Sequence, residues 1–397
     1  MTMHYMNNRH QHGCSEENGF SLVELLIAMT LGLILVAGMM TVFSGNKRSS
    51  DINSAMSDMQ ENARFALDNL ARDIRMSGFQ GCLDTNDGGS GSQNADSGGT
   101  IVVGEGVPTN NLIQTSAMAS VVGTGSIWLP SAPSGFVTAN HNALPGTHAL
   151  TLQFGSPATY PLDQDVNTGG TPNTTAPIIV DTTPGNSRDA FDLVVGDFAM
   201  ISNCQGADII KISSLSTGAN TATIGHAAPE NTSGALSQLY LDDDNVTKFM
   251  RFISNVYYVG DTGLTNENGD RITALYQHSL PYGDVISNPP TELVRGVEDL
   301  RVTFGIRNSN GSLNYVLPTD SLYNPSAVEN IRIGLLMNSY DRIADDDDSS
   351  TYVLAGQQIV PEGSTGAPDA AGTHSGDRRF RLAFNTTVKI RNRRNEF

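Results

Sequence analysis

The stretch G-F-S-L-V-E-L-L-I-A-M, residues 19–29, contains one carboxylate, Glu24, in a largely apolar run that continues to Phe43. A helix over the 24 residues from Phe20 to Phe43 would be roughly 36 Å long at about 1.5 Å per residue, and a bilayer core is about 30 Å thick. We therefore expect a single membrane-spanning helix at residues 20–43. A charged side chain near the bilayer centre costs roughly 2.5 kcal/mol or more, so Glu24 requires a specific reason.

Two ordinary kinds of N-terminal segment do not account for Glu24. A secretory signal peptide has a basic leader, an apolar core of about 7–15 residues and a cleavage site after that core. Here the apolar segment is longer, and Arg9 is the only Lys or Arg before it. A plain signal anchor fits the length, but it explains neither the carboxylate nor the abrupt change from polar to apolar sequence between Gly19 and Phe20.

The motif G-F-S-L-V-E closely resembles the prepilin signature of type IV pilins and type II secretion pseudopilins. The resemblance implies that a prepilin peptidase removes residues 1–19 by cutting between Gly19 and Phe20, and then methylates the new N-terminus at Phe20. It also implies that Glu24 pairs with the free amine of a neighbouring subunit when helices stack in a filament. Such a pair is strong at low dielectric, which makes Glu24 an assembly contact.

Beyond the apolar segment, a helical stripe predicts that the same helix continues to about Met76. Apolar side chains recur at steps of three or four residues, as on one face of a helix, and Gly78 is a plausible stop. We expect residues 44–77 to be an amphipathic half-helix that packs on a sheet. The members of the stripe are Ile52, Met56, Met59, Ala63, Ala66, Leu70 and Ile74.

Residues 78–397 are expected to form a β-rich globular domain. Segments with mostly alternating apolar and polar residues predict half-buried antiparallel strands, and one helix followed by many strands indicates an α+β fold. The resemblance to prepilins adds to this a type IV pilin-like architecture, with a long N-terminal helix packed on an antiparallel β-rich C-terminal domain. The predicted strands lie at 101–103, 149–154, 191–202, 208–213, 249–260, 272–279, 300–306, 330–339 and 380–392.

Several segments along almost the whole chain resemble the PilW family of minor pilins. They are A-R-D-I-R-M-S-G-F-Q-G-C (71–82), G-D-F-A-M-I-S-N-C-Q-G-A-D-I-I-K-I-S (196–213), 292–306, 330–339 and 378–393, whereas 105–190 and 340–376 match nothing recognisable. The resemblance implies a minor pilin at or near the tip of a type IV pilus. It would prime pilus assembly and support twitching motility and adhesion, in a Gram-negative bacterium. Implied partners are the prepilin peptidase, other minor pilins, the major pilin, a PilY-type tip adhesin and the inner membrane, which the chain crosses once with a periplasmic domain.

The three cysteines are Cys14, Cys82 and Cys204. Cleavage after Gly19 would remove Cys14 with the leader. The resemblance to the PilW family then implies a disulfide between Cys82 and Cys204, which suits the oxidising periplasm. Two free buried thiols are the alternative.

Composition and motifs argue against most other functions. The formal net charge is −18, so direct nucleic-acid binding is not expected. The run Asp345–Asp348 lacks the spacing of a calcium loop, so we expect a solvated acidic loop and no metal. No cofactor or enzyme motif is found, and we expect no catalytic residue.

One basic cluster near the C-terminus could touch DNA or anionic lipid, with a solvated strand as the simpler interpretation. Its members are Arg378, Arg379, Arg381, Lys389, Arg391, Arg393 and Arg394.

Two other functions stay open. A type II secretion pseudopilin of the GspJ kind shares the signature and the general architecture. A membrane-anchored adhesin or DNA receptor would use the unmatched segments 105–190 and 340–376 as its binding surface.

Overall fold

The computed structural model describes two compact units, Met1–Ser54 and Ala55–Phe397, and each is considered by itself. The described residues are 20–81, 116–121, 125–129, 136, 140–166, 175–184, 191–203, 206–231, 236, 239–242, 246–280, 285–308, 310–323, 327–364 and 370–391.

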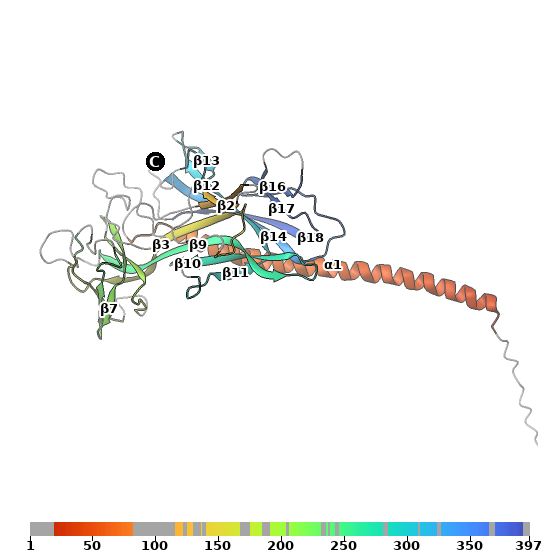
Figure 1. The fold of residues 1–397 in the computed structure, drawn as a ribbon, viewed down its shortest axis with the longest axis horizontal. Helices are drawn as coiled ribbons and strands as arrows, with labels where there is room; N and C mark the ends of the chain where they lie inside the picture. Colours follow the sequence, from red (N-terminus) through yellow and green to blue (C-terminus); the bar gives the residue numbers. More distant parts are fainter. Residues whose placement is uncertain are drawn as a thin grey trace, which may run out of the picture. The chain divides into compact units, whose positions relative to one another are not determined.

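The first unit consists of the beginning of α1, a helix that extends from Leu22 to Met76 (Figure 1). Its large apolar side chains are exposed, and those of Phe20, Leu33 and Phe43 are 87%, 69% and 72% accessible. This helix is long and apolar enough to cross a membrane. The expected single long helix is thus confirmed.

The part of α1 in the second unit buries the predicted stripe. Met59, Ala63, Ala66, Leu70 and Ile74 are all at most 4% exposed. The two earlier members of the stripe, at positions 52 and 56, are half-buried. The helix ends two residues before the predicted glycine stop at position 78, whose φ of 75° favours glycine.

A large antiparallel sheet follows the strand order β11-β10-β9-β3-β1-β2, and β5 pairs with both β6 and β9. Its longest strands, β3 and β9, pair over most of their length, with Leu152 opposite Asn255. The bounds are β1 Ser116–Val121, β2 Gly125–Leu129, β3 His148–Pro161, β5 Phe198–Ser202, β6 Ala207–Lys211, β9 Lys248–Thr265, β10 Arg271–Ser279 and β11 Thr291–Arg295.

Three smaller sheets complete the domain. A four-stranded antiparallel sheet has the order β13-β12-β14-β18, and two three-stranded sheets have the orders β15-β16-β17 and β4-β8-β7. Only the pairing of β16 with β17 is parallel among the described strands. The bounds are β4 Ile178–Asp181, β7 Ser214–Thr217, β8 Thr221–Gly225, β12 Val297–Arg307, β13 Leu313–Val316, β14 Val328–Arg342, β15 Tyr352–Leu354, β16 Gln357–Pro361, β17 Ala370–His374 and β18 Arg379–Lys389.

The main core joins α1 to both larger sheets. Leu70 and Ile74 of the helix belong to one buried cluster with Leu152 of β3, Tyr257 of β9 and Ile333 of β14. Each fully buried aliphatic side chain of this kind contributes about 1.5–3 kcal/mol, so the helix stripe is a major source of stability.

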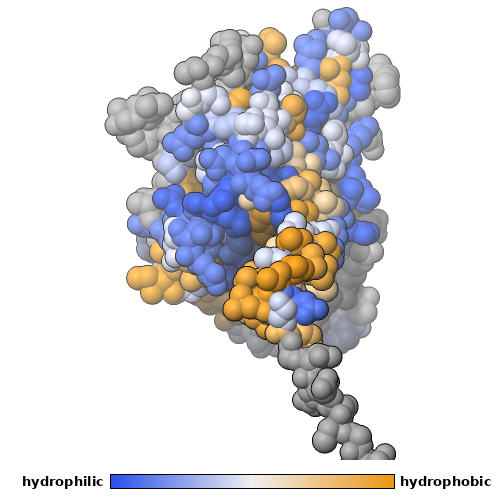
Figure 2. All heavy atoms as spheres, turned by 90° about the vertical axis from the view of Figure 1, so that its right-hand side faces the viewer, coloured by the Kyte–Doolittle hydropathy of each residue, from blue (hydrophilic) through white to orange (hydrophobic). Residues whose placement is uncertain are grey.

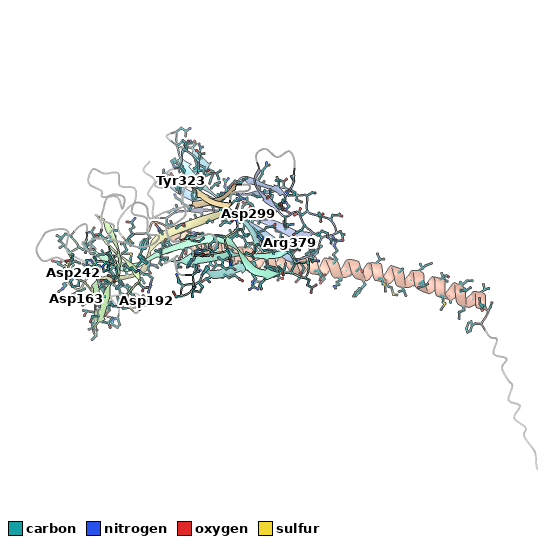
Figure 3. The ribbon with its side chains drawn as sticks, viewed as in Figure 1. Asp163, Asp192, Asp242, Asp299, Tyr323 and Arg379 are labelled. Carbon is teal, nitrogen blue, oxygen red and sulfur yellow. The ribbon has the colours of Figure 1, made fainter. Side chains whose placement is uncertain are left out.

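A separate core lies under the small sheet β4-β8-β7, around Ile178, Ile210 and Ile224. Figure 3 shows Asp163 and Asp242 at this end of the domain, apart from Asp299 and Arg379. These two cores are the two largest of five buried clusters among the described residues, and the buried residues of α1 belong to the first of them.

Most predicted strands are confirmed, and the predicted α+β class with them. The segment 191–202 is a partial error, because its first residues form a turn and only Phe198–Ser202 is a strand. The expected strand at 101–103 lies outside the described residues. Several short strands were not predicted from the sequence, among them β7, β8 and β17. Their sequences are rich in Ser, Thr, Gly and Ala, and they have too few apolar positions to show an alternating pattern.

One polar contact between α1 and the sheet was not expected from the stripe. The sequence places Asp73 largely off the apolar face, yet it is half-buried. Its Oδ2 atom accepts hydrogen bonds from the hydroxyl of Tyr257 at 2.5 Å and from Nδ2 of Asn255 at 2.8 Å. Burial raises the pKa of Tyr257, and the charge of Asp73 raises it further, so the phenol stays a donor. The pair fixes the rotation of the helix on β9.

We expect Asp73→Ala to lower the free energy of unfolding of the domain by about 2 kcal/mol, because two largely buried donors lose their acceptor. Urea unfolding of the full chain in lipid nanodiscs, followed by near-ultraviolet circular dichroism, measures this. Asp68→Ala is the matched control, since Asp68 is on the same helix, is 75% exposed and meets only Arg64 at 4.0 Å. A change below about 0.5 kcal/mol is expected there. Equal effects of the two substitutions would contradict the assignment.

Candidate functional site

The N-terminal end of α1 is organised by a local contact of Glu24. The first helical hydrogen bond runs from the N–H of Leu25 to the carbonyl of Ser21 at 3.1 Å, which makes Ser21 the N-cap residue. Oε2 of Glu24 accepts the backbone N–H of Ser21 at 3.4 Å. A serine N-cap with a glutamate three residues later is the arrangement of a capping box, and the carboxylate also interacts favourably with the helix dipole. In the single chain, Glu24 thus has a partner of its own.

The surface that follows Glu24 is apolar and exposed up to Phe43. The hydroxyl of Thr30 donates to the carbonyl of Ile27 at 2.9 Å, and that of Thr41 donates to Ala37 at 3.0 Å. These bonds satisfy the two threonine donors inside the helix. A continuous apolar surface of this length is unstable in water and requires lipid or other helices around it.

Two of the predicted site residues are described, and three are not. Phe20 lies two residues before the helix begins, and Glu24 lies in its first turn. The cleavage position Gly19 and the two cysteines Cys82 and Cys204 lie outside the described residues, so the structure does not test the predicted bridge. The cap role of Ser21 was missed in the sequence, although the S-L-V-E spacing at 21–24 is the signal that predicts it.

The acidic run and the C-terminal basic cluster meet in one buried ionic network. The guanidinium of Arg381 is 0% exposed and contacts Glu298 at 2.7 Å, Asp377 at 2.7 Å and Asp348 at 3.3 Å. Arg379, 8% exposed, contacts Asp377 at 2.9 Å. These contacts join β12, β18 and the loops on either side of the sheet β15-β16-β17. Buried ion pairs of this kind are costly to break, because one partner alone leaves an uncompensated charge.

This network corrects two expectations from the sequence. Arg379 and Arg381 are not part of an exposed basic surface, because both are buried against carboxylates. Within the acidic run, Asp346 and Asp347 are exposed as expected, but Asp348 is largely buried and accepts a hydrogen bond from the hydroxyl of Tyr352 at 2.8 Å. Periodicity could not predict this, because the partners come from separate strands and loops.

The network shifts the pKa values of its carboxyl groups. Burial alone would raise the pKa of Glu298, but the charge and hydrogen bonds of Arg381 outweigh burial and hold the pKa below its usual value. Burial also opposes the shift at Asp377, where the hydrogen bond and charge of Arg381 lower the pKa to about 2. Both groups are therefore ionised at neutral pH.

Among the described residues, no group of three His, Cys, Asp or Glu side chains is placed to hold a metal.

Two family models match the chain. Residues 256–392 match the family described as type IV pilus-assembly protein W, PilW, and residues 14–40 match the prokaryotic N-terminal methylation motif. These matches confirm the predicted resemblance to the PilW family and to prepilins. The PilW match covers about a third of the chain and includes β10, β11, β12, β14 and β18.

Comparisons with individual proteins add little. No curated protein matches the chain. Among solved structures, a type IV-like pilin from Thermus thermophilus matches with 15% sequence identity over 35% of this chain and 78% of that chain. The TM-score is 0.17, so this likeness supports no argument here.

We expect Asp377→Asn to flatten the acid dependence of stability. The folded pKa of Asp377, about 2, lies below its ordinary value of 3.8. The carboxylate therefore stabilises the fold above about pH 4, and this contribution is lost as the pH falls toward 2. After allowance for solvent screening it amounts to about 1 kcal/mol. Thermal unfolding between pH 5 and pH 2.5 measures it, with exposed Asp346→Asn as the control. A steep acid dependence that survives in Asp377→Asn would refute the role of this group.

Proposed function

We propose that this chain, whose residues 256–392 match the PilW family, is a minor pilin of the type IV pilus. In this proposal it is needed for priming and assembly of the pilus, lies at or near the tip, and supports twitching motility and adhesion. The observation that carries the proposal is the exposed apolar half of α1 with one carboxylate in its first turn, within a matched N-terminal methylation motif. In a free soluble domain, the apolar surface of such a helix would be exposed to water, which is unfavourable.

The proposed processing follows from the motif. A prepilin peptidase would cut between Gly19 and Phe20 and methylate Phe20, so that Glu24 becomes the fifth residue of the mature chain. The prepilin motif and the apolar helix fit a membrane-anchored pilin. In our proposal the helix crosses the inner membrane once, and the β-domain lies in the periplasm until the subunit enters the pilus.

Glu24 has two alternative partners in this proposal. In the isolated chain it accepts the N–H of Ser21 at 3.4 Å, which is long and therefore weak. In the assembled pilus it would pair with the N-terminal amine of a neighbouring subunit, a charge-assisted contact in a low-dielectric surrounding. Exchange of the weak local contact for the stronger one favours assembly and fixes the axial position of the subunit.

The proposed disulfide Cys82–Cys204 is supported by the described residues beside it. Ser202 donates a hydrogen bond from Oγ to the carbonyl of Gln80, and Gly81 approaches the same side chain. Cys82 follows Gln80 by two residues, and Cys204 follows Ser202 by two residues. This spacing is compatible with a bridge between the two cysteines. Alkylation of the unfolded, unreduced mature protein would label neither cysteine if the bridge exists, and would label both if the thiols are free.

The proposed partners are other minor pilins, the major pilin and a PilY-type tip adhesin, with no direct contact to nucleic acid. The burial of Arg379 and Arg381 supports the last point, because it removes two cations from the only basic cluster. The match of residues 256–392 to a pilus-assembly family also supports a structural subunit without catalytic activity.

A GspJ-like pseudopilin remains the second candidate, because it shares the N-terminal features. Deletion of the gene distinguishes the two functions when sheared surface pili and secreted enzymes are measured in the same strain. Loss of pili with normal secretion is expected for a minor pilin. Normal pili with failed secretion would refute the assignment to the pilus.

We expect Glu24→Ala to be cleaved after Gly19 but to assemble poorly, with at least a tenfold loss of the subunit from sheared pili. The physical reason is that the substitution removes the charge partner of the neighbouring amine. Glu61→Ala is the matched control, because Glu61 is an exposed carboxylate of the same helix beyond the apolar segment. Immunoblots of sheared fractions measure incorporation. Normal incorporation of Glu24→Ala would show that the carboxylate has no role in assembly.

A further inference from the structure

A polar cleft of about 1210 Å³ lies within the β-domain. Its walls come from several parts of the chain. They are the segment before β3, the β9–β10 hairpin, β12, the segment after β13, β14, β16 with the residue after it, β17 with the loop that follows it, and the start of β18. The lining includes His148, Asp261, Asp299, Thr319 and Ser375. Figure 2 shows a face of the molecule on which hydrophilic side chains gather around a hollow.

The cleft brings together two distant parts of the chain. Residues 144–148 belong to the segment 105–190, which the sequence left unmatched. Residues 357, 362 and 371–375 belong to 340–376, which was also expected to be unmatched but lies within the match to the PilW family. They are more than 200 residues apart in sequence, and they meet at Arg301. Its guanidinium donates to the carbonyl of Gly146 at 2.6 Å and to that of Ala371 at 3.1 Å. A side chain at position 372 would collide with Arg301, because a Cβ there would lie 2.0 Å from Nη2.

The charges around the cleft are largely compensated by pairs. Asp261 contacts Arg271 at 3.1 Å, and Asp299 contacts Arg301 at 2.8 Å. A third lining carboxylate, Asp270, is paired with an arginine at 2.5 Å. Glu298 and Asp377 belong to the network of Arg381 described above. A strongly charged ligand would have to compete with these guanidinium–carboxylate pairs, whereas a neutral ligand can use the remaining lone pairs and N–H groups.

One side chain that lines the cleft, His148, has unused hydrogen-bonding capacity. His148 is 6% exposed, and its Nδ1 atom accepts the N–H of Val302 at 3.1 Å. Burial and the charge of Arg301 lower the pKa of His148 to about 3, so the neutral ring carries its hydrogen on Nε2. That N–H has no hydrogen-bond partner among the described residues.

We propose that this cleft is a binding site for a neutral carbohydrate. A sugar hydroxyl both donates and accepts a hydrogen bond, and the cleft offers it one free donor, the Nε2–H of His148. The paired carboxylates and guanidinium groups of the walls supply further acceptors and donors at fixed positions. The volume is larger than that of a typical small-molecule site, so it accommodates an oligosaccharide better than a single small ion. This site is independent of the assembly function of α1.

The test uses the full-length mature protein in lipid nanodiscs, because detergents with sugar headgroups would compete for the cleft. The probes are an array of neutral oligosaccharides, sialylated oligosaccharides and a lysine-rich peptide, with positive binders titrated by calorimetry. We expect saturable binding of at least one neutral oligosaccharide and none of the lysine-rich peptide. Binding of only charged probes, or of no probe, would overturn the proposal.

Two substitutions locate the binding. His148→Asn keeps an acceptor for the N–H of Val302 but removes the Nε2 donor, and it should weaken binding about tenfold. Thr319→Trp places a bulky ring at the exposed rim and should abolish binding. Ser321→Trp is its matched control, since Ser321 is exposed nearby and does not line the cleft. Circular dichroism checks that each variant is folded. Unchanged binding in Thr319→Trp would place the site elsewhere and refute the proposal.

Discussion

The β-domain depends on the burial of one face of α1. Ala63, Ala66 and Leu70 are 0% exposed, and their small or aliphatic side chains let the helix approach both larger sheets. Close packing of this kind contributes most of the favourable free energy, but it is not directional. The contact of Asp73 with Tyr257 fixes the rotation of the helix about its axis, because a hydrogen bond of 2.5 Å tolerates little rotation. Packing and polar anchoring together make the helix part of the domain.

The same helix meets a different requirement at its other end. From Leu22 to Phe43 its apolar side chains are exposed, so their burial has to come from lipid or from other subunits. Glu24 is the exception in this surface, and the capping contact with Ser21 explains how a single chain tolerates it. The weakness of that contact is useful for a subunit that assembles, since a partner with a full positive charge can replace it.

The ionic network around Arg381 connects strands that hydrogen bonds of the sheets do not connect. Glu298 lies on β12, Asp377 precedes β18, and Asp348 precedes β15. Because Arg381 is completely buried, its guanidinium depends on these carboxylates to compensate its charge. The network therefore holds the loops that form one wall of the polar cleft. A binding surface built in this way is rigid, which lowers the entropy lost when a ligand binds.

The sequence by itself determined the features that depend on neighbouring residues. The apolar run with Glu24, the stripe from Met59 to Ile74 and the alternation in β18 all follow from local periodicity, which fixes which side chains share a face. The expected half-burial of β9, β12 and β14 is wrong, because consecutive residues of these strands are buried over most of their length. The cap at Ser21 belongs to this class as well, because a capping box is a pattern of four residues. Only the tertiary structure decided the rest. The partners of Arg379 and Arg381, the buried role of Asp73 and the meeting of distant segments at Arg301 depend on which strands and loops become neighbours. That choice is made by packing of the whole core, and it leaves no periodic signal in the sequence.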